Sequence, residues 1–375
     1  MQIYLDHAAS SPLHPKALKA MMPYLGLSYG NPSSVHSFGR KQKAAIENVR
    51  KSIANHLGAK SSEIYFCSSG TEANNIALKL AVQDLNVERI ITSHVEHKCV
   101  LNTAKFLKDQ HNIEVEYLDL GIYGQVDLNH LEKLLLKSNK KTLVSIMHIQ
   151  NELGSINNID RIGELCKQSD AFFHSDTVQS IGHYSLNLEN LNISFLSASA
   201  HKFNGPLGIG FLYKKSTIAL SPWLHGGGHE RNLRSSTENV PGIVGMGEAL
   251  KIAYANLEKD KAQINKIKTQ LKNGLLAIHK EILFNEIPEE TTYTILSCSI
   301  PNRLINDTFT IQLDMAGISV STGSACSSGA VKGSDVLEFL NLNTDYSTFR
   351  FSFSTFTKSG EIDYVLDFFR EELGN

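Results

Sequence analysis

The chain has 375 residues, of which 42% are hydrophobic and 20% are charged, and this balance excludes a disordered or fibrous protein. Its 36 basic and 38 acidic residues form no basic cluster, so neither nucleic acid nor a membrane surface is an expected partner. No run approaches the ~18 apolar residues of a membrane helix, and the N-terminus lacks a signal peptide, so we expect a cytoplasmic protein. Five cysteines without Cys-x-x-Cys spacing predict reduced thiols rather than disulfides or structural zinc.

Short apolar runs alternate with helical patterns between about residue 60 and residue 215. The runs fall at residues 63–66, 89–92, 115–118, 143–147, 171–173, 194–196 and 209–212. Strands that are apolar throughout are typical of a sheet covered on both faces. The sequence therefore predicts an α/β fold with a mostly parallel central sheet flanked by helices.

A second, smaller domain is expected because the chain exceeds the size at which a single core usually stops growing. Residues 252–282 have the amphipathic pattern of a helix leading out of the first domain. Further strands are predicted at residues 293–297 and 349–353. We predict a large domain at residues 15–255 and a smaller α+β domain formed by residues 256–375 with residues 1–14. By pattern alone, the first dozen residues could pack on either domain.

Polar residues follow the predicted strands, at the edge where an open parallel sheet binds its ligands. Gly70 and Thr71 begin a helix after the first strand, where backbone N–H groups and a hydroxyl can bind phosphate. A plain N-cap is the alternative. His94 and His97 follow the second strand but lack a third metal ligand of suitable spacing. A ring-stacking or proton-transfer role for one of them competes with an ordinary structural role.

Asp176 and Lys202 follow later strands and would face the same edge of the sheet. A buried carboxylate needs a cationic partner, such as a pyridinium nitrogen, although an N-cap is the alternative for Asp176. A lysine in a crevice can form an imine with an aldehyde, whereas a lysine considered alone is more often solvated. Together with a phosphate cradle and a histidine, these residues complement pyridoxal phosphate, which we predict as the cofactor.

Cys326 lies in a run of small residues with almost no apolar character, Ser321-Thr322-Gly323-Ser324-Ala325-Cys326-Ser327-Ser328-Gly329-Ala330. A structural cysteine normally sits in an apolar stripe, so we expect a thiol on an exposed loop, with a chance cysteine as the alternative. Another segment, His225-Gly226-Gly227-Gly228, resembles an esterase oxyanion loop. That interpretation fails because no Gly-x-Ser-x-Gly accompanies it.

Eight segments resemble the NifS/IscS-type cysteine desulfurases, a class V aminotransferase group of fold type I pyridoxal-phosphate enzymes. They are Leu5-Asp6-His7-Ala8-Ala9, Gly30-Asn31-Pro32-Ser33-Ser34, Thr71-Glu72-Ala73-Asn74-Asn75, Glu96-His97-Lys98, Asn151-Glu152-Leu153-Gly154, His201-Lys202, His225-Gly226-Gly227-Gly228-His229-Glu230 and Gly323-Ser324-Ala325-Cys326. The resemblance runs in order from about residue 3 to residue 370 and so covers nearly the whole chain.

The resemblance implies a role for each matching residue. Lys202 would hold pyridoxal phosphate as a Schiff base, Asp176 would face the ring nitrogen, and His97 would stack on the ring and handle protons. The other cofactor ligands would be Asn151 and Gln179 near the ring hydroxyl, and Gly70, Thr71, Ser199 and His201 at the phosphate. Thr237 would reach the phosphate of the neighbouring subunit in a homodimer. Substrate would be bound by Asn31, Asn151 and Arg350, with Arg350 holding its carboxylate.

The implied reaction converts L-cysteine to L-alanine. Lys202 would remove the α-proton, and the thiolate of Cys326 would attack the substrate sulfur and become a persulfide. A sulfur-acceptor protein, such as an iron–sulfur scaffold, would take the sulfur. No resident metal is implied, and Cys326 could ligate an iron–sulfur cluster only transiently. The alternatives are a pyridoxal-phosphate lyase acting on selenocysteine or a cysteine conjugate without an enzyme thiol, and a catalytically idle sulfur carrier.

Overall fold

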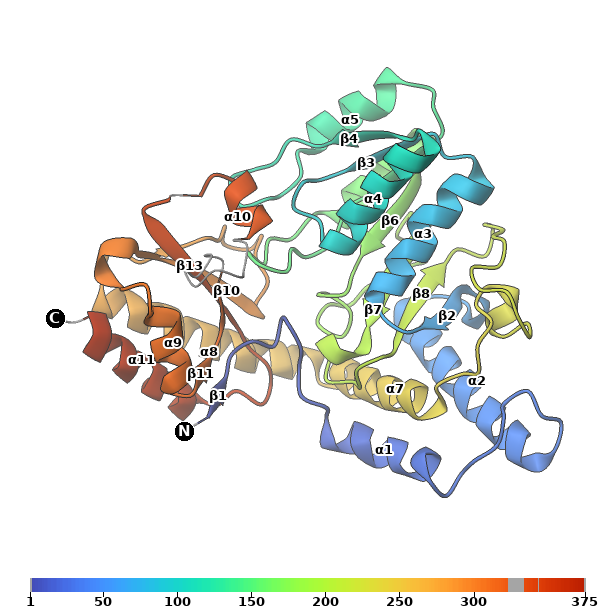
Figure 1. Ribbon diagram of the computed structural model, residues 1–375, viewed down its shortest axis with the longest axis horizontal. Helices are drawn as coiled ribbons and strands as arrows, with labels where there is room; N and C mark the ends of the chain where they lie inside the picture. The colour runs from blue at the N-terminus through green and yellow to red at the C-terminus, as the bar shows by residue number, and fades with distance from the viewer. Residues whose placement is uncertain (1, 323–333, 343, 374–375) are drawn as a thin grey trace.

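The computed structural model describes residues 2–322, 334–342 and 344–373. Its larger part is built on a seven-stranded sheet with the order β2-β8-β7-β6-β5-β3-β4 (Figure 1). The strands are β2 (Ile64–Cys67), β3 (Arg89–Thr92), β4 (Glu114–Tyr117), β5 (Thr142–Ser145), β6 (Phe172–Asp176), β7 (Phe195–Ser199) and β8 (Gly210–Lys214). Neighbouring strands from β7 to β4 are parallel, whereas β8 runs antiparallel to both β2 and β7. The predicted α/β fold is confirmed.

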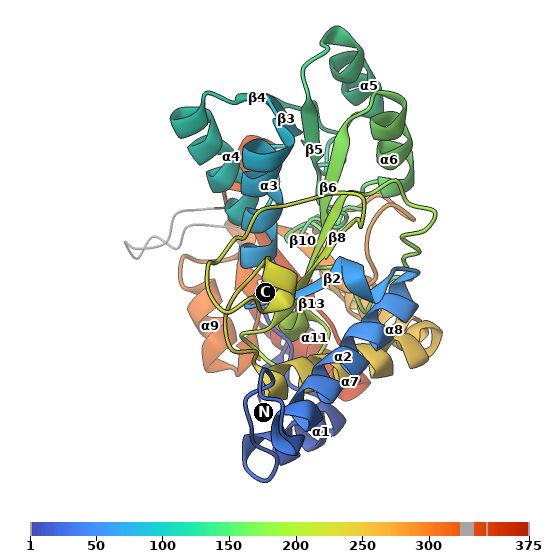
Figure 2. The ribbon, with the colours of Figure 1, turned by 90° about the vertical axis from the view of Figure 1, so that its right-hand side faces the viewer.

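Helices cover both faces of this sheet (Figure 2). The helices of the larger part are α1 (Pro15–Leu25), α2 (Ser37–Leu57), α3 (Gly70–Leu85), α4 (Lys98–His111), α5 (Leu128–Lys137), α6 (Ile159–Gln168) and α7 (Val240–Ala255). Alternate residues of β2 show how the sheet is buried: Ile64 and Phe66 join the apolar cluster under α2, α5, α6 and α7. Tyr65 and Cys67 join the cluster under α3 and α4. Burial on both faces explains why the strands read as continuous apolar runs.

The smaller part has its own apolar cluster and a four-stranded antiparallel sheet in the order β12-β13-β10-β9. Its strands are β9 (Leu283–Phe284), β10 (Ile295–Pro301), β12 (Ser321–Thr322) and β13 (Tyr346–Ser352), with helices α8 (Leu257–Ile278), α9 (Phe309–Met315), α10 (Asp335–Phe339) and α11 (Ser359–Leu373). A separate pair joins β1 (Ile3–Tyr4) to β11 (Ile318–Ser319). Among the described helices, none has the length and apolar character of a membrane span.

The helix predicted at residues 252–282 is two helices, α7 and α8, which meet at Asn256. The Asn256 side chain donates a hydrogen bond to the carbonyl of Ile252, 2.9 Å away, and its backbone N–H donates to Ile252 and Ala253. Asparagine competes for backbone groups in this way and favours helix ends. The prediction of one continuous helix is therefore wrong, although α8 does lead into the smaller part.

The first fourteen residues contact both parts of the molecule. The backbone N–H of Leu5 donates to Ser319 in the smaller part, whereas those of Ser11 and His14 donate to His201 and Asn204 in the larger part. The segment therefore crosses the junction between the two parts. This crossing brings Asp6, Ala8 and Ala9 to the carboxyl edge of the central sheet.

Candidate active site

A cavity of about 390 Å³ lies where β2, β5, β6 and β7 end. Ten residues predicted for the site line it: Gly70, Thr71, His97, Asn151, Asp176, Gln179, Ser199, His201, Lys202 and Arg350. They come from successive strand ends, from α3 and α4, and from β13 of the smaller part. The parallel sheet brings them together because the carboxyl ends of its strands share one edge.

One end of the cavity is the N-terminus of α3, a helix of 16 residues. Ser69 caps the helix by accepting a hydrogen bond from the backbone N–H of Glu72, 3.3 Å away. The segment therefore does contain an N-cap, at Ser69. The next residue must be small, since a Cβ at Gly70 would lie 2.4 Å from Cγ2 of Val178. Thr71 and Ser199 add hydroxyls to the same cavity. This cradle of N–H groups and hydroxyls suits a phosphate.

His201 lines the same cavity, and its Nδ1 lies 3.2 Å from Oγ of Ser10. Burial, together with the nearby charge of Lys202, lowers the pKa of His201 to about 4. The imidazole is therefore neutral at physiological pH, and it has one N–H to donate to a ligand.

Asp176, at the end of β6, is a buried carboxylate in the cavity wall, with 7% of its surface exposed. Its Oδ2 accepts from Nδ2 of Asn74 at 2.6 Å, and its Oδ1 accepts from the backbone N–H of Val178 at 3.0 Å. That second bond closes a turn, and no α-helix follows for Asp176 to cap. No ion pair to Asp176 occurs in the described part of the chain. A buried carboxylate without a cation fits a protonated ring nitrogen.

Lys202 ends a 3-10 helix (Ala200–Lys202), and its Nζ donates to the carbonyls of Ala8 and Ala9 at 2.6 and 2.8 Å. Burial, aided by the charge of Arg350, lowers the pKa of Lys202 to about 8, while Asp176 and Asp6 act in the opposite direction. A substantial fraction of the amine is therefore neutral near physiological pH. A neutral amine is the form that attacks an aldehyde or accepts a proton.

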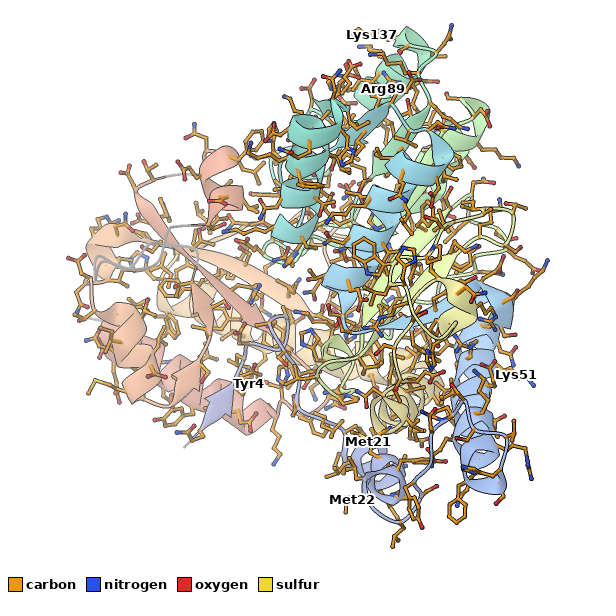
Figure 3. The ribbon with its side chains drawn as sticks, turned by 45° about the vertical axis from the view of Figure 1, so that its right-hand side comes forward. Tyr4, Met21, Met22, Lys51, Arg89 and Lys137 are labelled. Carbon is orange, nitrogen blue, oxygen red and sulfur yellow. The ribbon has the colours of Figure 1, made fainter. Side chains whose placement is uncertain are left out.

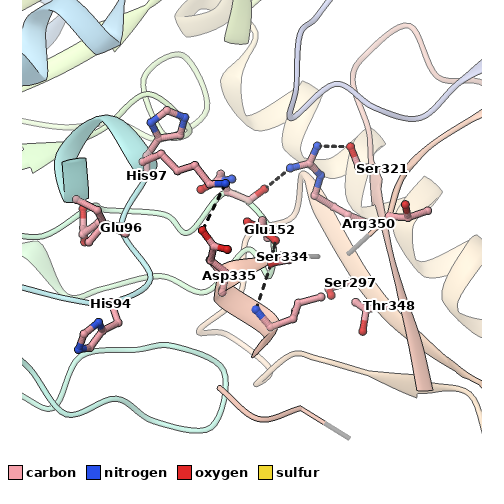
Figure 4. A pocket seen from close by; sticks show the side chains of 16 residues that line it. His94, Glu96, His97, Glu152, Ser297, Ser321, Ser334, Asp335, Thr348 and Arg350 are labelled. Atoms are coloured by element: carbon pink, nitrogen blue, oxygen red, sulfur yellow. Dashed lines mark hydrogen bonds and ion pairs between the residues drawn. The ribbon is translucent and has the colours of Figure 1, made fainter. Parts of the chain in front are cut away.

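A second cavity of about 320 Å³ shares His97, Asn151 and Arg350 with the first (Figure 4). Nη2 of Arg350 donates to Oδ1 of Asp6 and to Oγ of Ser321, each at 2.7 Å, and Nη1 donates to the carbonyl of Asn151 at 2.8 Å. Within the described residues, its buried Nε has no partner. Arg350 is thus a fixed guanidinium at the junction of the two cavities.

Cys326 lies outside the described residues. The described residues on either side of its segment, Thr322 and Ser334, both line the second cavity. Ser334 donates a hydrogen bond to Glu152, and Asp335 pairs with Lys98 at 3.4 Å (Figure 4). These contacts tie the start of α10 to the larger part, beside His97.

Two predicted residues lie away from the first cavity of this chain. Asn31 is exposed in the loop between α1 and α2, and its Oδ1 accepts from the backbone N–H of Ser33 at 2.9 Å. Thr237 lines a separate cavity of about 160 Å³, together with Ser236 and Cys67. Oγ of Ser33 lies 3.1 Å from Nε2 of His229, which precedes Thr237 in the same loop.

No role was assigned from the sequence to Asp6, Asn74 or Cys99, although Asp6 and Asn74 lie in two of the segments that carry the family resemblance. Asn74 lies one helical turn after Thr71, so helical spacing could have placed it on the same face. Cys99 and Asp6 carry no such signal. His97 Nδ1 lies 2.9 Å from Cys99 Sγ. No cluster of potential metal ligands occurs among the residues that the structure describes.

Comparison with known proteins assigns the family. The family model for aminotransferase class-V matches residues 3–365. The chain belongs to this family. A cysteine desulfurase IscS of Dictyoglomus turgidum is 38% identical to this chain, and the alignment covers 98% of this chain and 93% of the relative.

Solved structures of the same family agree. One described as a NifS-like protein has a TM-score of 0.92 and 34% identity, covering 100% of both chains. Another, described as SspA in complex with cysteine, has a TM-score of 0.80 and 32% identity, covering 95% of this chain and 100% of the other. The resemblance to NifS/IscS-type proteins, predicted from the motifs, is confirmed.

Proposed function

We propose that the protein is a cysteine desulfurase that uses pyridoxal phosphate. It converts L-cysteine and an enzyme thiol into L-alanine and an enzyme persulfide on Cys326. The observation that carries this proposal is one cavity lined by Asp176, Lys202 and Arg350. Asp176 is a buried carboxylate with no ion pair among the described residues, Lys202 is a lysine of lowered pKa, and Arg350 is a fixed guanidinium. L-cysteine as the substrate is also supported by relatives named cysteine desulfurase and by a solved structure described as a complex with cysteine.

The residues of the first cavity fit pyridoxal phosphate. Gly70, Thr71, Ser199 and His201 would hold its phosphate, Asp176 its ring nitrogen and Lys202 its aldehyde carbon, with Asn151 and Gln179 near its hydroxyl and His97 on its ring face. When bound, the cofactor supplies an electron sink for the electrons of the substrate α-carbon. The fit rests on the carboxylate of Asp176, because a neutral or cationic side chain there could not hold a proton on the ring nitrogen.

The chain's own residues then divide the remaining work. Arg350 binds the substrate carboxylate with its guanidinium, whose position Asp6 and Ser321 fix. Nζ of Lys202 takes the α-proton as a neutral amine, which its lowered pKa makes available. His97, exposed at the N-terminus of α4, places an imidazole that can donate or accept a proton at the mouth shared by both cavities.

Cys326 supplies the nucleophile. Its thiolate attacks the substrate sulfur, so that a sulfur–sulfur bond forms while the carbon–sulfur bond breaks. The electron pair of the broken carbon–sulfur bond passes to the β-carbon, which takes a proton. The thiolate is oxidised to a persulfide and the substrate carbon is reduced, so no other redox partner is needed. A thiol-bearing acceptor protein, such as an iron–sulfur scaffold, would then take the sulfur.

The working unit that we propose is a homodimer. Seven large apolar side chains are exposed within residues 18–38: Leu18, Met22, Leu25, Leu27, Tyr29, Val35 and Phe38. Figure 3 shows Met22 of this patch at the outer edge of the molecule. So dense a patch is typical of an interaction surface. Asn31 lies within it, and a second copy placed there would let Asn31 and Thr237 reach the partner's site.

Two further predictions stay proposals. The domain boundaries, 15–255 against 1–14 with 256–375, are supported by the two separate groups of apolar clusters. A cytoplasmic location is supported by the chemistry, since persulfide transfer suits a reducing compartment.

The function is tested by supplying purified protein with pyridoxal phosphate and L-cysteine. We expect L-alanine to accumulate and mass spectrometry to find one added sulfur atom on Cys326. Cys326→Ala should form neither product, whereas Cys166→Ala, in α6 and remote from the site, should form both. If Cys326→Ala still produces alanine and sulfide, the protein is a lyase that needs no thiol. If the wild-type protein leaves L-cysteine unchanged, the proposal fails.

A further inference from the structure

The amide of Asn74 joins two groups of the site from beneath the cavity wall. Asn74 is fully buried in α3. Its Nδ2 donates to Oδ2 of Asp176 at 2.6 Å and to Sγ of Cys99 at 3.1 Å. Oδ1 of Asp176 already accepts from the backbone N–H of Val178, and Oδ2 accepts from this NH₂ group, so the amide nitrogen of Asn74 faces Asp176 and its oxygen faces away.

The other side of the amide meets a buried histidine. Oδ1 of Asn74 lies 3.0 Å from Nε2 of His174, whose Nδ1 lies 2.9 Å from Oγ of Ser145. Burial lowers the pKa of His174 to about 3, so the ring is neutral and has one proton. Since Oδ1 only accepts, that proton is on Nε2, and Ser145 donates to Nδ1. Each hydrogen bond from Ser145 through His174 and Asn74 to Asp176 therefore has one defined donor. These bonds hold the Asn74 amide in one orientation, with its nitrogen toward Asp176.

Cys99 extends the network to His97. Nδ1 of His97 accepts from the backbone N–H of Cys99 at 3.1 Å, and Sγ of Cys99 lies 2.9 Å from the same nitrogen. Burial raises the pKa of the Cys99 thiol to about 12, so the sulfur keeps its hydrogen. The S–H can therefore donate to Nδ1, and the single proton of a neutral His97 is then on Nε2.

We infer that Asn74 and Cys99 are positioning residues that connect Asp176 to His97. Asn74 fixes the carboxylate that faces the ring nitrogen, and Cys99 holds His97 in the Nε2–H tautomer with its ring turned toward the cavity. The roles of Asp176 and His97 rest on the proposed function, whereas the tautomer and the hydrogen bonds do not. Cys99 is not expected to accept the substrate sulfur, because a thiol that keeps its proton is a poor nucleophile.

The test compares Cys99→Ala with Cys99→Ser in the full-length protein without cofactor. Long-range ¹H–¹⁵N spectra of histidine-labelled protein report the protonation of each ring nitrogen, and His97→Gln assigns the His97 signals. We expect the Nε2–H tautomer in the wild type. In Cys99→Ala the Nδ1 resonance of His97 should shift, because that nitrogen loses the thiol donor and keeps a weaker hydrogen bond. In Cys99→Ser the resonance should return toward its wild-type position.

Activity gives a second measurement. Cys99→Ala should lower kcat for L-cysteine by about 2- to 10-fold with KM unchanged, the effect of one lost hydrogen bond, and Cys99→Ser should recover most of it. Asn74→Ala should weaken pyridoxal phosphate binding by a similar factor, whereas Asn129→Ala, at an exposed position of α5, should not. Identical Nδ1 resonances in the wild type and Cys99→Ala would overturn the inference, and so would a Cys99→Ser variant that behaves like Cys99→Ala. A protein inactive on L-cysteine would overturn the proposed function but leave the spectra to decide this inference.

Discussion

Lys202 is subject to opposing influences on its pKa. Burial and Arg350 disfavour the ammonium form, whereas Asp176 and Asp6 favour it, and the balance leaves a pKa of about 8. The neutral amine therefore forms more than two pH units below the ordinary lysine pKa of ~10.4. The functional consequence is a nucleophile that needs no separate base at mildly alkaline pH.

The rate of imine formation should follow this titration. In cofactor-free protein mixed with pyridoxal phosphate, we expect the rate to rise as pH increases through about 8 and to level off above it, because only the free amine attacks. Arg350→Gln removes a lowering influence and should move the midpoint upward. Stopped-flow absorbance gives both midpoints. A midpoint near the ordinary lysine value would contradict the assignment.

A second prediction concerns the guanidinium of Arg350. Arg350→Lys keeps the charge but loses the planar fork, and we expect KM for L-cysteine to rise about 10- to 100-fold because charge-assisted hydrogen bonds are lost. Steady-state kinetics measure the change. Arg303→Lys, an exposed arginine of the smaller part, serves as the control and should leave KM unchanged. Equal KM values for both variants would remove Arg350 from substrate binding.

Single residues also mark how far the sequence could predict the site. Asp176 ends β6 and Lys202 comes shortly after β7, so their place at the sheet edge was predictable from the apolar runs alone. Their partners were not. Asp6 is 344 residues from Arg350 and Asn74 is 102 residues from Asp176 along the chain, and no local pattern reports such contacts.

Among the elements, the loop that carries Thr237 depends on a buried ion pair. Glu230, Arg231 and Asn232 form a 3-10 turn with positive φ angles of 46°, 54° and 66°. Nη1 and Nη2 of Arg50, in α2, each donate to the Glu230 carboxylate at 2.7 Å, and the backbone N–H of Phe66 donates to it at 2.8 Å. Left-handed backbone is costly for residues other than glycine, so this pair must hold the turn in place.

Removing one partner of that pair should cost much more than removing a surface pair. We expect Glu230→Gln to lower the free energy of unfolding by about 3 kcal/mol, since it removes the buried carboxylate that binds both Nη atoms of Arg50. The charge partner that remains is the more exposed Glu47, whose Oε1 lies 3.1 Å from Nε of Arg50. Arg303→Gln breaks the exposed pair with Glu281 and should cost less than about 1 kcal/mol. Chemical denaturation at one protein concentration measures both. Similar losses in the two variants would mean that the buried pair does not stabilise the loop.

For the whole molecule, the decisive surface is the apolar patch at residues 18–38. Leu27 and Val35 are 90% and 87% exposed, which is unfavourable unless a second chain covers them. We expect Leu27→Glu combined with Val35→Glu to convert a dimer into a monomer, as measured by sedimentation velocity. Leu136→Glu, at an isolated exposed position on α5, should remain dimeric. A wild-type protein that sediments as a monomer would contradict the proposed homodimer.

The sequence by itself determined the α/β class, the strand positions and the chemical types at the strand ends, because each depends on local periodicity or on residues adjacent to a strand. The tertiary structure decided which of these meet. It placed the N-terminal segment across both parts, set Arg350 against Asp6 and joined Asp176 to His97 through Asn74 and Cys99. It also left Asn31 and Thr237 away from the first cavity of their own chain. Such contacts arise from packing between distant segments, which periodicity along a chain does not encode.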